Sequence, residues 1–223
     1  ATSGITHCGD TEFRWGERTY IMGVINVTPD SFSGDGLSDD IEAAVAQGHR
    51  FVAEGADILD IGGESTRPGA SPVSVEEELR RVIPVIEQLA GEIPLPLSID
   101  TYKWEVARPA ITSGARMIND IWGLRRDPRL AKLAAEWEVP IILMSNQRDN
   151  SCQDIIPQVM ACLRKSVELA LELGVRRENI IIDPGIGFGK TLEQNLEIVR
   201  RLDGVKAPPA IKPEAINVPR WKR

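Results

Sequence analysis

The sequence is poor in the residue types that build metal clusters and disulfide frameworks. Three cysteines and two histidines occur among its 223 residues. Cys8, Cys152 and Cys162 lie far apart without the spacing of a metal site. An odd number of cysteines with no framework indicates a reducing cytosol, so we expect a cytoplasmic protein. His7 and His49 accompany no nucleophile, which favours structural roles for both.

Long apolar runs and a basic excess are missing too. No stretch approaches the roughly 18 apolar residues of a membrane helix, and the N-terminus lacks the apolar core of a signal peptide. The net charge is −7 and the pI is about 5.0. This charge argues against a nucleic-acid surface, because such a surface needs clustered Lys and Arg. We expect neither nucleic-acid nor membrane partners, whereas a local site could still bind a small anion.

The residues that are present suit a globular α/β protein. Apolar residues make up 42% and charged residues 26%, and the chain is long enough for one large domain. Short apolar runs alternate strictly with helical patterns, which predicts parallel strands joined by right-handed crossovers. The expected strands are 20–27, 57–61, 95–100, 116–119, 140–144 and 180–182. The expected helices are 41–55, 74–89, 104–113, one from 127, 155–173 and one from 192.

Polar side chains stand at the C-terminal end of every predicted strand. They are Asn26, Ser65-Thr66, Asp100, Asn119-Asp120, Ser145-Asn146 and Asp183. A closed barrel gathers such ends at one rim, whereas an open sheet concentrates its site at one switch point. The distribution favours the barrel. We therefore predict an α/β, TIM-barrel-like (β/α)8 fold with only about six β/α units present.

The two ends of the chain differ in character from its middle. Residues 1–18 are polar and contain glycine, and we interpret them as an N-terminal lead-in. Residues 19–203 are expected to form the barrel domain, incomplete by two units. Residues 204–223 hold four prolines and five basic residues without helical or strand periodicity. That composition predicts a divergent, disordered tail.

Five motifs resemble those of dihydropteroate synthases and occur in the order of that family. The resemblance covers about residues 18 to 203, and motifs of this length with few free positions are highly specific. They read Met22-Gly23-Val24-Ile25-Asn26-Val27-Thr28-Pro29-Asp30-Ser31-Phe32-Ser33, Asp60-Ile61-Gly62-Gly63-Glu64-Ser65-Thr66-Arg67-Pro68-Gly69, Ser98-Ile99-Asp100-Thr101, Ile118-Asn119-Asp120 and Asp183-Pro184-Gly185-Ile186-Gly187-Phe188-Gly189-Lys190. The resemblance implies the (β/α)8 fold and a transferase of folate biosynthesis. Its substrates would be a dihydropterin methyl diphosphate and p-aminobenzoate, and it would release diphosphate.

The chemistry of a pterin ring suits the polar residues of these motifs. The ring presents an amidine-like edge with two parallel donors, and a buried carboxylate accepts both as a fork. Asp183 is the best candidate, although an Asp before Pro-Gly is also a common turn residue. Asn119 offers a donor and an acceptor for the remaining ring edge, or is itself a turn residue. Asp100 could hold a ring nitrogen or cap the helix that follows it.

Departure of diphosphate leaves negative charge on oxygen, so the site needs cations and N–H groups. The resemblance implies that Asn26 binds Mg²⁺, with diphosphate oxygens and water completing the shell. It also implies that Thr66 and Arg67 contact the diphosphate and the p-aminobenzoate pocket, with Pro68 as an apolar wall. The same Arg-Pro-Gly turn could be plain surface. Lys190 is a cation at the site rim or, equally, a solvated turn residue, and no catalytic residue is assigned.

Two features of the family are missing from this sequence. The family often has His after the Met that ends its fifth strand, where this chain has Ser145 after Met144. The Ser-Arg-Lys-Ser segment and the late Arg-x-His of its last two strands, which contact pterin and diphosphate, are not found. Because the resemblance breaks off near Asp203, we expect a truncated or frame-shifted gene, or an incomplete piece of the protein. The resemblance implies a homodimer, because the family commonly forms dimers, although the late barrel helices through which it pairs are largely absent from this sequence.

Two alternatives to a dihydropteroate synthase-type transferase stay open. The first is a non-catalytic remnant that binds a pterin, because loss of two strands would expose sheet edges. The second is a pterin-dependent methyltransferase, which recognises its pterin with similar Asp and Asn residues. The loops at residues 26–32 and 65–69 argue against the methyltransferase.

Overall fold

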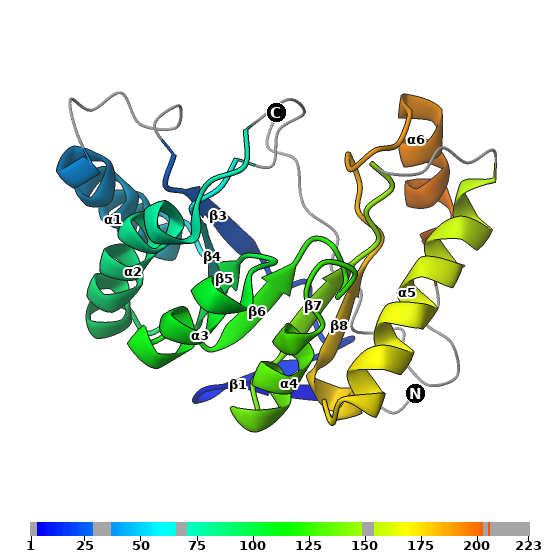
Figure 1. Ribbon diagram of the computed structural model, residues 1–223, viewed down its shortest axis with the longest axis horizontal. Coiled ribbons are helices and arrows are strands. Elements are labelled where there is room, and N and C mark those ends of the chain that lie inside the picture. The colour runs from blue at the N-terminus through cyan, green and yellow to red at the C-terminus, as the bar shows by residue number, and fades with distance from the viewer. Residues whose placement is uncertain (1–3, 29–36, 66–70, 149–153, 203–204, 206–223) are drawn as a thin grey trace. The chain divides into compact units, whose positions relative to one another are not determined.

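The computed structural model describes residues 4–28, 37–65, 71–148, 154–202 and 205. From β3 onward, strands and helices alternate along the chain (Figure 1). The strands are β1 Ile5–Cys8, β2 Thr11–Arg14, β3 Met22–Asn26, β4 Ile58–Gly62, β5 Leu97–Asp100, β6 Met117–Asp120, β7 Ile141–Met144 and β8 Ile180–Asp183. The α-helices are α1 Leu37–Ala53, α2 Val75–Glu92, α3 Trp104–Ser113, α4 Arg129–Glu136, α5 Ile155–Glu172 and α6 Leu192–Arg200. A short 3-10 helix, Arg177–Asn179, precedes β8.

The chain divides into two compact units. The N-terminal unit comprises Cys8–Thr11 and Tyr20–Asn119. The C-terminal unit comprises Ala1–His7, Glu12–Thr19 and Asp120–Arg223. Each strand from β3 to β8 is followed by one helix, so the described residues contain the six β/α units that the sequence predicted.

In the N-terminal unit, β3, β4, β5 and β6 run parallel in that order. One level of the register is a layer of isoleucines, all fully buried: Ile25, Ile61, Ile99 and Ile118. The same face of the strands meets the helices, because a side chain at Gly23 or Gly63 would collide with Phe51 of α1 or Val82 of α2. Each buried isoleucine contributes about 1.5–3 kcal/mol to folding. The layer therefore packs the strands against their helices. It also places the residue that follows each isoleucine at a common level across the four strands.

In the C-terminal unit, β7 and β8 form a parallel pair from Ile141 opposite Ile180 to Met144 opposite Asp183. Every residue of both strands is buried. Helix α5 packs on this pair, and the apolar residues of its buried face are Ile155, Ile156, Val159, Leu163, Val167 and Ala170. The wholly apolar runs in the sequence are therefore explained, because both faces of these strands are covered.

Most element boundaries follow from the sequence, and one element does not. Helix α3 ends at Ser113 before Gly114, and α5 ends at Glu172 before Gly174, close to the predicted ends. The lead-in segment, by contrast, contains the two-stranded sheet of β1 and β2. Phe13 is fully buried in it, and Gly9 makes its turn with φ +59°. A single buried aromatic in a polar stretch gave too short a pattern to predict two strands.

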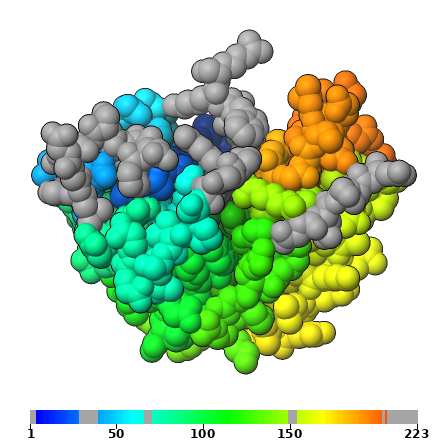
Figure 2. All heavy atoms as spheres, turned by 45° about the horizontal axis from the view of Figure 1, so that its top comes forward, coloured from blue at the N-terminus to red at the C-terminus, as the bar shows by residue number. Residues whose placement is uncertain are grey.

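Helix α6 has an exposed apolar side. It packs against α5 within the C-terminal unit and, in orange, stands out from the surface in Figure 2. Leu192, Leu196 and Val199, the residues that predicted this helix, are 69%, 44% and 54% exposed. The helix was therefore predicted correctly, although these three side chains point to solvent. None of the helices in the described ranges combines the length and apolar character that crossing a membrane requires.

Candidate functional site

Four residues of the N-terminal unit stand at one level across the C-terminal ends of neighbouring strands. The register pairs Asn26 of β3 with Gly62 of β4, Gly62 with Asp100 of β5, and Asp100 with Asn119 of β6. A Cβ atom on Gly62 would lie 3.3 Å from Asp100 Oδ2 and 3.4 Å from Asn26 Oδ1. Both side chains therefore reach toward the Gly62 α-carbon, and glycine leaves them the space. The structure thus brings together three of the predicted site residues.

A buried carboxylate lies two residues before this row on the same face of the sheet. Asp60 is 2% exposed, and its Oδ2 accepts a hydrogen bond of 2.9 Å from Asn119 Nδ2. Burial raises the pKa of Asp60, and the Ser98 hydroxyl and the Asn119 amide only partly oppose this shift. The bond also orients Asn119, because its NH₂ group is committed to Asp60 and its Oδ1 is turned away.

Sequence reasoning gave Asp60 no role of its own. The available signal was an acidic residue in the middle of the apolar run Ile58-Leu59-Asp60-Ile61. The Ser98 hydroxyl, level with Asp60 on the neighbouring strand β5, lies beside this carboxylate and lowers its pKa against the effect of burial.

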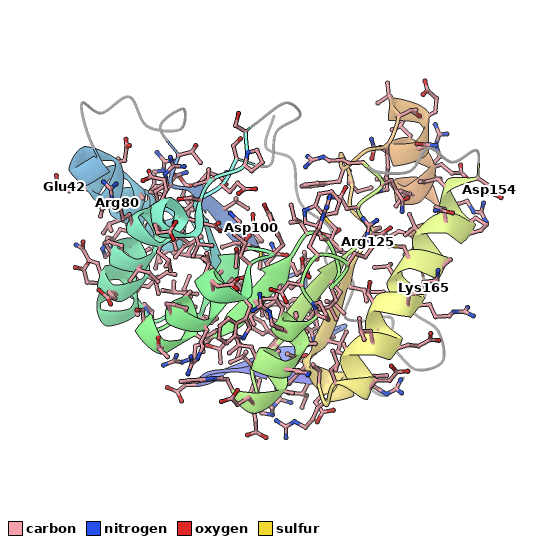
Figure 3. The ribbon with its side chains drawn as sticks, in the orientation of Figure 1. Glu42, Arg80, Asp100, Arg125, Asp154 and Lys165 are labelled. Carbon is pink, nitrogen blue, oxygen red and sulfur yellow. The ribbon has the colours of Figure 1, made fainter. Side chains whose placement is uncertain are left out.

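The sequence also left open that Asp100 caps α3. Figure 3 shows it at the end of β5. The start of the helix has another partner, since Thr101 Oγ1 accepts a hydrogen bond of 3.2 Å from the Lys103 N–H. A capping role for Asp100 stays a prediction.

In the C-terminal unit, Asp183 ends β8 with 6% of its surface exposed. Its Oδ1 accepts a hydrogen bond of 2.7 Å from the Gly185 N–H, and its carbonyl oxygen accepts one of 2.9 Å from the Ser145 N–H. The turn role considered for this aspartate is therefore present. It does not exclude ligand binding, because a carboxylate has two oxygens and each accepts more than one bond.

The glycine-rich turn after Asp183 is held by Lys190. Its Nζ donates to the carbonyl oxygens of Ser145 at 2.8 Å, Gly185 at 2.7 Å and Phe188 at 3.2 Å. An ammonium group has three donors. The sequence predicted a rim cation or a solvated turn residue, and neither prediction included these contacts. In the structure Lys190 stabilises the turn through these hydrogen bonds, and its role toward a ligand stays a prediction.

The turn itself depends on backbone conformations that favour glycine. Gly185, Gly187 and Gly189 have φ values of +72°, +84° and +71°. The Gln147 N–H donates to the Phe188 carbonyl at 3.1 Å, and the Arg148 guanidinium lies 4.7 Å from the centre of the Phe188 ring. Burial lowers the pKa of Arg148. The turn after β8 and the loop after β7 are thus packed together over Asp183.

Asp120, the neighbour of Asn119, has a structural role. It is 1% exposed, and its two oxygens accept hydrogen bonds from the Trp122 N–H at 2.9 Å and the Leu124 N–H at 2.6 Å. Burial raises its pKa to about 6 despite these two bonds. The carboxylate holds a turn in which Leu124 adopts φ +66°. The predicted residues Thr66, Arg67 and Pro68 lie outside the described residues.

Comparison with known proteins gives one consistent family. The model of the pterin-binding enzymes matches residues 22–213. Dihydropteroate synthase of Clostridium beijerinckii is 50% identical over 198 residues, which are 89% of this chain and 74% of that protein. Dihydropteroate synthase of Bacillus subtilis is 47% identical over 199 residues, or 89% of this chain and 70% of that protein.

Solved structures agree with this result. Dihydropteroate synthase of Xanthomonas albilineans with 4-aminobenzoic acid superposes with a TM-score of 0.86 at 46% identity, covering 92% of this chain and 74% of that one. The same enzyme in complex with 7,8-dihydropteroate gives a TM-score of 0.81 at 42% identity, covering 90% and 73%. The fold is therefore TIM-barrel-like, as predicted. On the family match and these relatives, the chain belongs to the dihydropteroate synthase family.

Proposed function

We propose that the chain condenses a dihydropterin methyl diphosphate with p-aminobenzoate and releases diphosphate. The observation that carries the proposal is the level row of Asn26, Gly62, Asp100 and Asn119, which sets carboxylate and amide oxygens at adjacent strand ends. The C-terminal ends of parallel strands are where such folds bind ligands. The bound molecules named for the Xanthomonas albilineans enzyme, 4-aminobenzoic acid and 7,8-dihydropteroate, are one substrate and the product of this reaction.

The pterin would be recognised by carboxylates and an amide. Asp183 would accept the two parallel donors of the pterin edge, and its burial strengthens such charge-assisted bonds. Asn119 would accept from the ring through Oδ1, because its NH₂ is held by Asp60. Asp100 would bind a ring nitrogen. These roles explain why a buried carboxylate, Asp183, and the partly exposed Asp100 and Asn119 stand at these strand ends.

Asn26 is the residue proposed to hold Mg²⁺. Its Oδ1 and Asp100 Oδ2 both lie near the space that a side chain on Gly62 would fill. This position therefore has room for an ion and oxygen ligands to bind it. A neutral amide oxygen fits Mg²⁺, which keeps most of its coordination for phosphate and water. When bound, Mg²⁺ would offset the charge that develops on the departing diphosphate. Thr66 and Arg67 would contact the anion and the arylamine, with Pro68 as an apolar wall.

The chemistry needs positioning and charge stabilisation rather than an enzyme nucleophile. The arylamine nitrogen forms a bond to the methylene carbon of the dihydropterin, and the carbon–oxygen bond to diphosphate breaks before or during this attack. The nitrogen then loses one proton to solvent. Asp183 and Asn119 would fix the ring, so that the methylene carbon faces the incoming nitrogen.

The direct test mixes the protein with both substrates and Mg²⁺ and follows diphosphate release. The parent should turn over, and Asp183→Ala should reduce turnover at least a hundredfold, because two charge-assisted bonds are lost. The matched control is Asp154→Ala, which removes an exposed carboxylate of the same unit that makes no capping bond (Figure 3). Full activity in Asp183→Ala, or none in the parent, would refute the proposal.

Location and assembly complete the proposal. A cytoplasmic location fits the described cysteines, Cys8 and Cys162, both of which are free. A homodimer would have an apolar surface available on α6 at Leu192, Leu196 and Val199. Light scattering of the parent and of Leu192→Glu would test it, since a monomeric parent would exclude the homodimer.

A further inference from the structure

Asp60 is a buried acidic residue to which the proposed function assigns no contact with a substrate. In the register of the N-terminal unit it is level with Val24 of β3 and Ser98 of β5. This level lies two residues before the row of strand ends, roughly 6–7 Å along the strands and on the same face of the sheet. Asp60 nevertheless contacts the row, because its Oδ2 accepts a hydrogen bond of 2.9 Å from Asn119 Nδ2.

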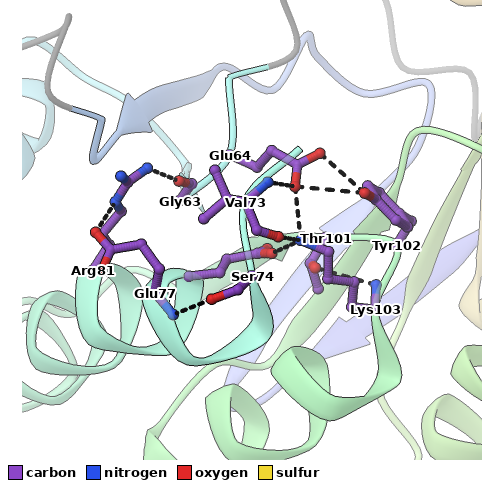
Figure 4. Close-up of polar contacts among 10 residues, drawn as sticks. Gly63, Glu64, Val73, Ser74, Glu77, Arg81, Thr101, Tyr102 and Lys103 are labelled. Carbon is purple, nitrogen blue, oxygen red and sulfur yellow. Dashed lines mark hydrogen bonds and ion pairs between the residues drawn. The ribbon is translucent and has the colours of Figure 1, made fainter. Parts of the chain in front are cut away.

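Asp60 lacks the cation that usually accompanies a buried carboxylate. Within the described residues it forms no salt bridge, and its partners are the Asn119 amide and the Ser98 hydroxyl. Glu64, two residues after β4, shows the contrast, because Lys103 Nζ donates to its Oε2 at 2.7 Å (Figure 4). An apolar side chain would fill the position of Asp60 at a lower cost. The carboxylate is therefore better explained by its effect on Asn119 than by stability.

The Asp60 carboxylate decides which end of the Asn119 amide a ligand meets. An ionised carboxylate only accepts hydrogen bonds, whereas an amide donates from its NH₂ group and accepts at its oxygen. Asn119 therefore turns its NH₂ toward Asp60 and its Oδ1 away. Asn119 is half-buried at the strand end, and Asp100, its neighbour in the row, also presents oxygens that accept. A ligand at these two strand ends must therefore supply N–H or O–H groups.

This requirement distinguishes two oxidation states of a pterin ring. In a 7,8-dihydropterin N8 carries a hydrogen, whereas in the fully oxidised ring N8 is doubly bonded to C7 and offers only a lone pair. The neighbouring N1 is an acceptor in both forms. The proposed function gives the two donors of the amidine-like edge to Asp183, so N8–H is the remaining ring N–H. Asn119 Oδ1 would accept this hydrogen and would face a lone pair in the oxidised ring.

We propose that Asp60 is a positioning residue that makes Asn119 select the 7,8-dihydro form of the pterin over the fully oxidised form. This inference rests on the proposed function, which assigns Asn119 to the ring. A site built to hydrogen-bond one N–H group rejects an analogue that lacks it, because a polar group of the protein is then left unpaired. Asp60 itself touches no substrate and acts through the orientation of the amide.

The test measures the binding of two ligands that differ only in oxidation state. They are 6-hydroxymethyl-7,8-dihydropterin and 6-hydroxymethylpterin, titrated calorimetrically without oxygen and without Mg²⁺. Asp60→Asn keeps the size of the side chain but can offer either an NH₂ group or an oxygen, so it no longer forces one orientation on Asn119. Asp60→Leu is a second variant, in which an apolar side chain replaces the buried charge. Ser98→Ala is the matched control, because it alters the same level of the sheet and leaves the bond between Asp60 and Asn119 in place.

The expected result is a change in the ratio of two dissociation constants. In the parent the oxidised pterin should bind about thirtyfold more weakly than the dihydropterin, which is ~2 kcal/mol. The ratio should fall below threefold in Asp60→Asn and in Asp60→Leu and should stay above tenfold in Ser98→Ala. Because both constants are measured on the same variant, a purely structural loss of binding-competent protein would weaken both alike and leave the ratio unchanged.

Other outcomes would overturn the inference. A ratio near one in the parent, or a parental ratio in either folded Asp60 variant, would show that Asp60 does not set the choice of oxidation state. Normal diphosphate release in the parent would then leave the proposed function intact. A parent that binds neither pterin would overturn both. A parent with the expected ratio but no turnover would refute the proposed reaction alone.

Discussion

Gly185 offers the sharpest test of how the turn after β8 is built. It has φ +72°, and a Cβ atom there would overlap the Ser145 carbonyl oxygen and lie 3.1 Å from both Lys190 Nζ and Met144 Cγ. Gly55, after α1, has φ +90°, and its added Cβ would meet nothing within 4 Å. The two alanine variants therefore share the cost of a left-handed backbone but differ in crowding.

The expected losses of stability follow from the cost of the left-handed backbone and the cost of crowding. The left-handed conformation costs an L-residue about 1–2 kcal/mol, partly offset by the lower entropy of the unfolded chain. Gly55→Ala should therefore destabilise by about 1 kcal/mol. Overpacking against backbone adds about 1–3 kcal/mol, so Gly185→Ala should destabilise by about 2–4 kcal/mol. The crowding term is the difference between the variants, about 1–3 kcal/mol.

Urea unfolding at constant slope measures both losses, since the midpoint then reports the free energy of unfolding. Pterin affinity should also fall in Gly185→Ala, because the Gly185 N–H binds Asp183 Oδ1. Equal losses of stability in the two variants would refute the argument, since the contacts of Gly185 with Ser145 and Lys190 would then carry no cost.

Three further predictions concern a titration, a metal site and the core. Because the folded pKa of Asp120 is raised to about 6, its contribution to stability is complete below pH 3.8 and is lost as pH rises through 6. The free energy of unfolding of Asp120→Asn relative to the parent should rise by up to about 3 kcal/mol between pH 3.5 and pH 7, and a pH-independent difference would contradict this. Asn26→Ala should raise the Mg²⁺ concentration needed for half-maximal diphosphate release at least tenfold without changing pterin binding in Mg²⁺-free buffer; an unchanged requirement would remove Asn26 from the metal site. Ile99→Ala should lower the free energy of unfolding by about 2–5 kcal/mol, whereas exposed Val199→Ala should change it by less than about 0.5 kcal/mol; comparable losses would mean that the isoleucine layer is not the core.

The sequence predicted the parallel strands well because their signals are local. Apolar runs such as 141–144 need burial on both faces, and a polar residue that ends such a run must stand at the strand end. The register then aligns Asn26, Asp100 and Asn119 without further information. The alternation of strands and helices likewise predicted the fold class before any distance was known.

The residues that sequence reasoning missed act through long-range contacts. Asp60 is explained by Asn119, which lies 59 positions later, and Lys103 by Glu64, which lies 39 positions earlier. Lys190 was ambiguous for the same reason, since the Ser145 carbonyl that it binds is 45 positions away. The periodicity of apolar residues in a sequence does not predict contacts between such distant residues. The isolated charge at Asp60, within an apolar strand, was the one visible signal.

The central claim is that the Asp183 carboxylate accepts the paired donors of a pterin. Isothermal titration of a pterin into the parent and into Asp183→Asn tests it directly, because the amide keeps the size of the side chain but has a single acceptor oxygen and an NH₂ group that repels a donor. The account predicts that the dissociation constant rises at least a hundredfold, ~2.7 kcal/mol, with the melting temperature nearly unchanged. A dissociation constant within threefold of the parent's, in a folded variant, would contradict it.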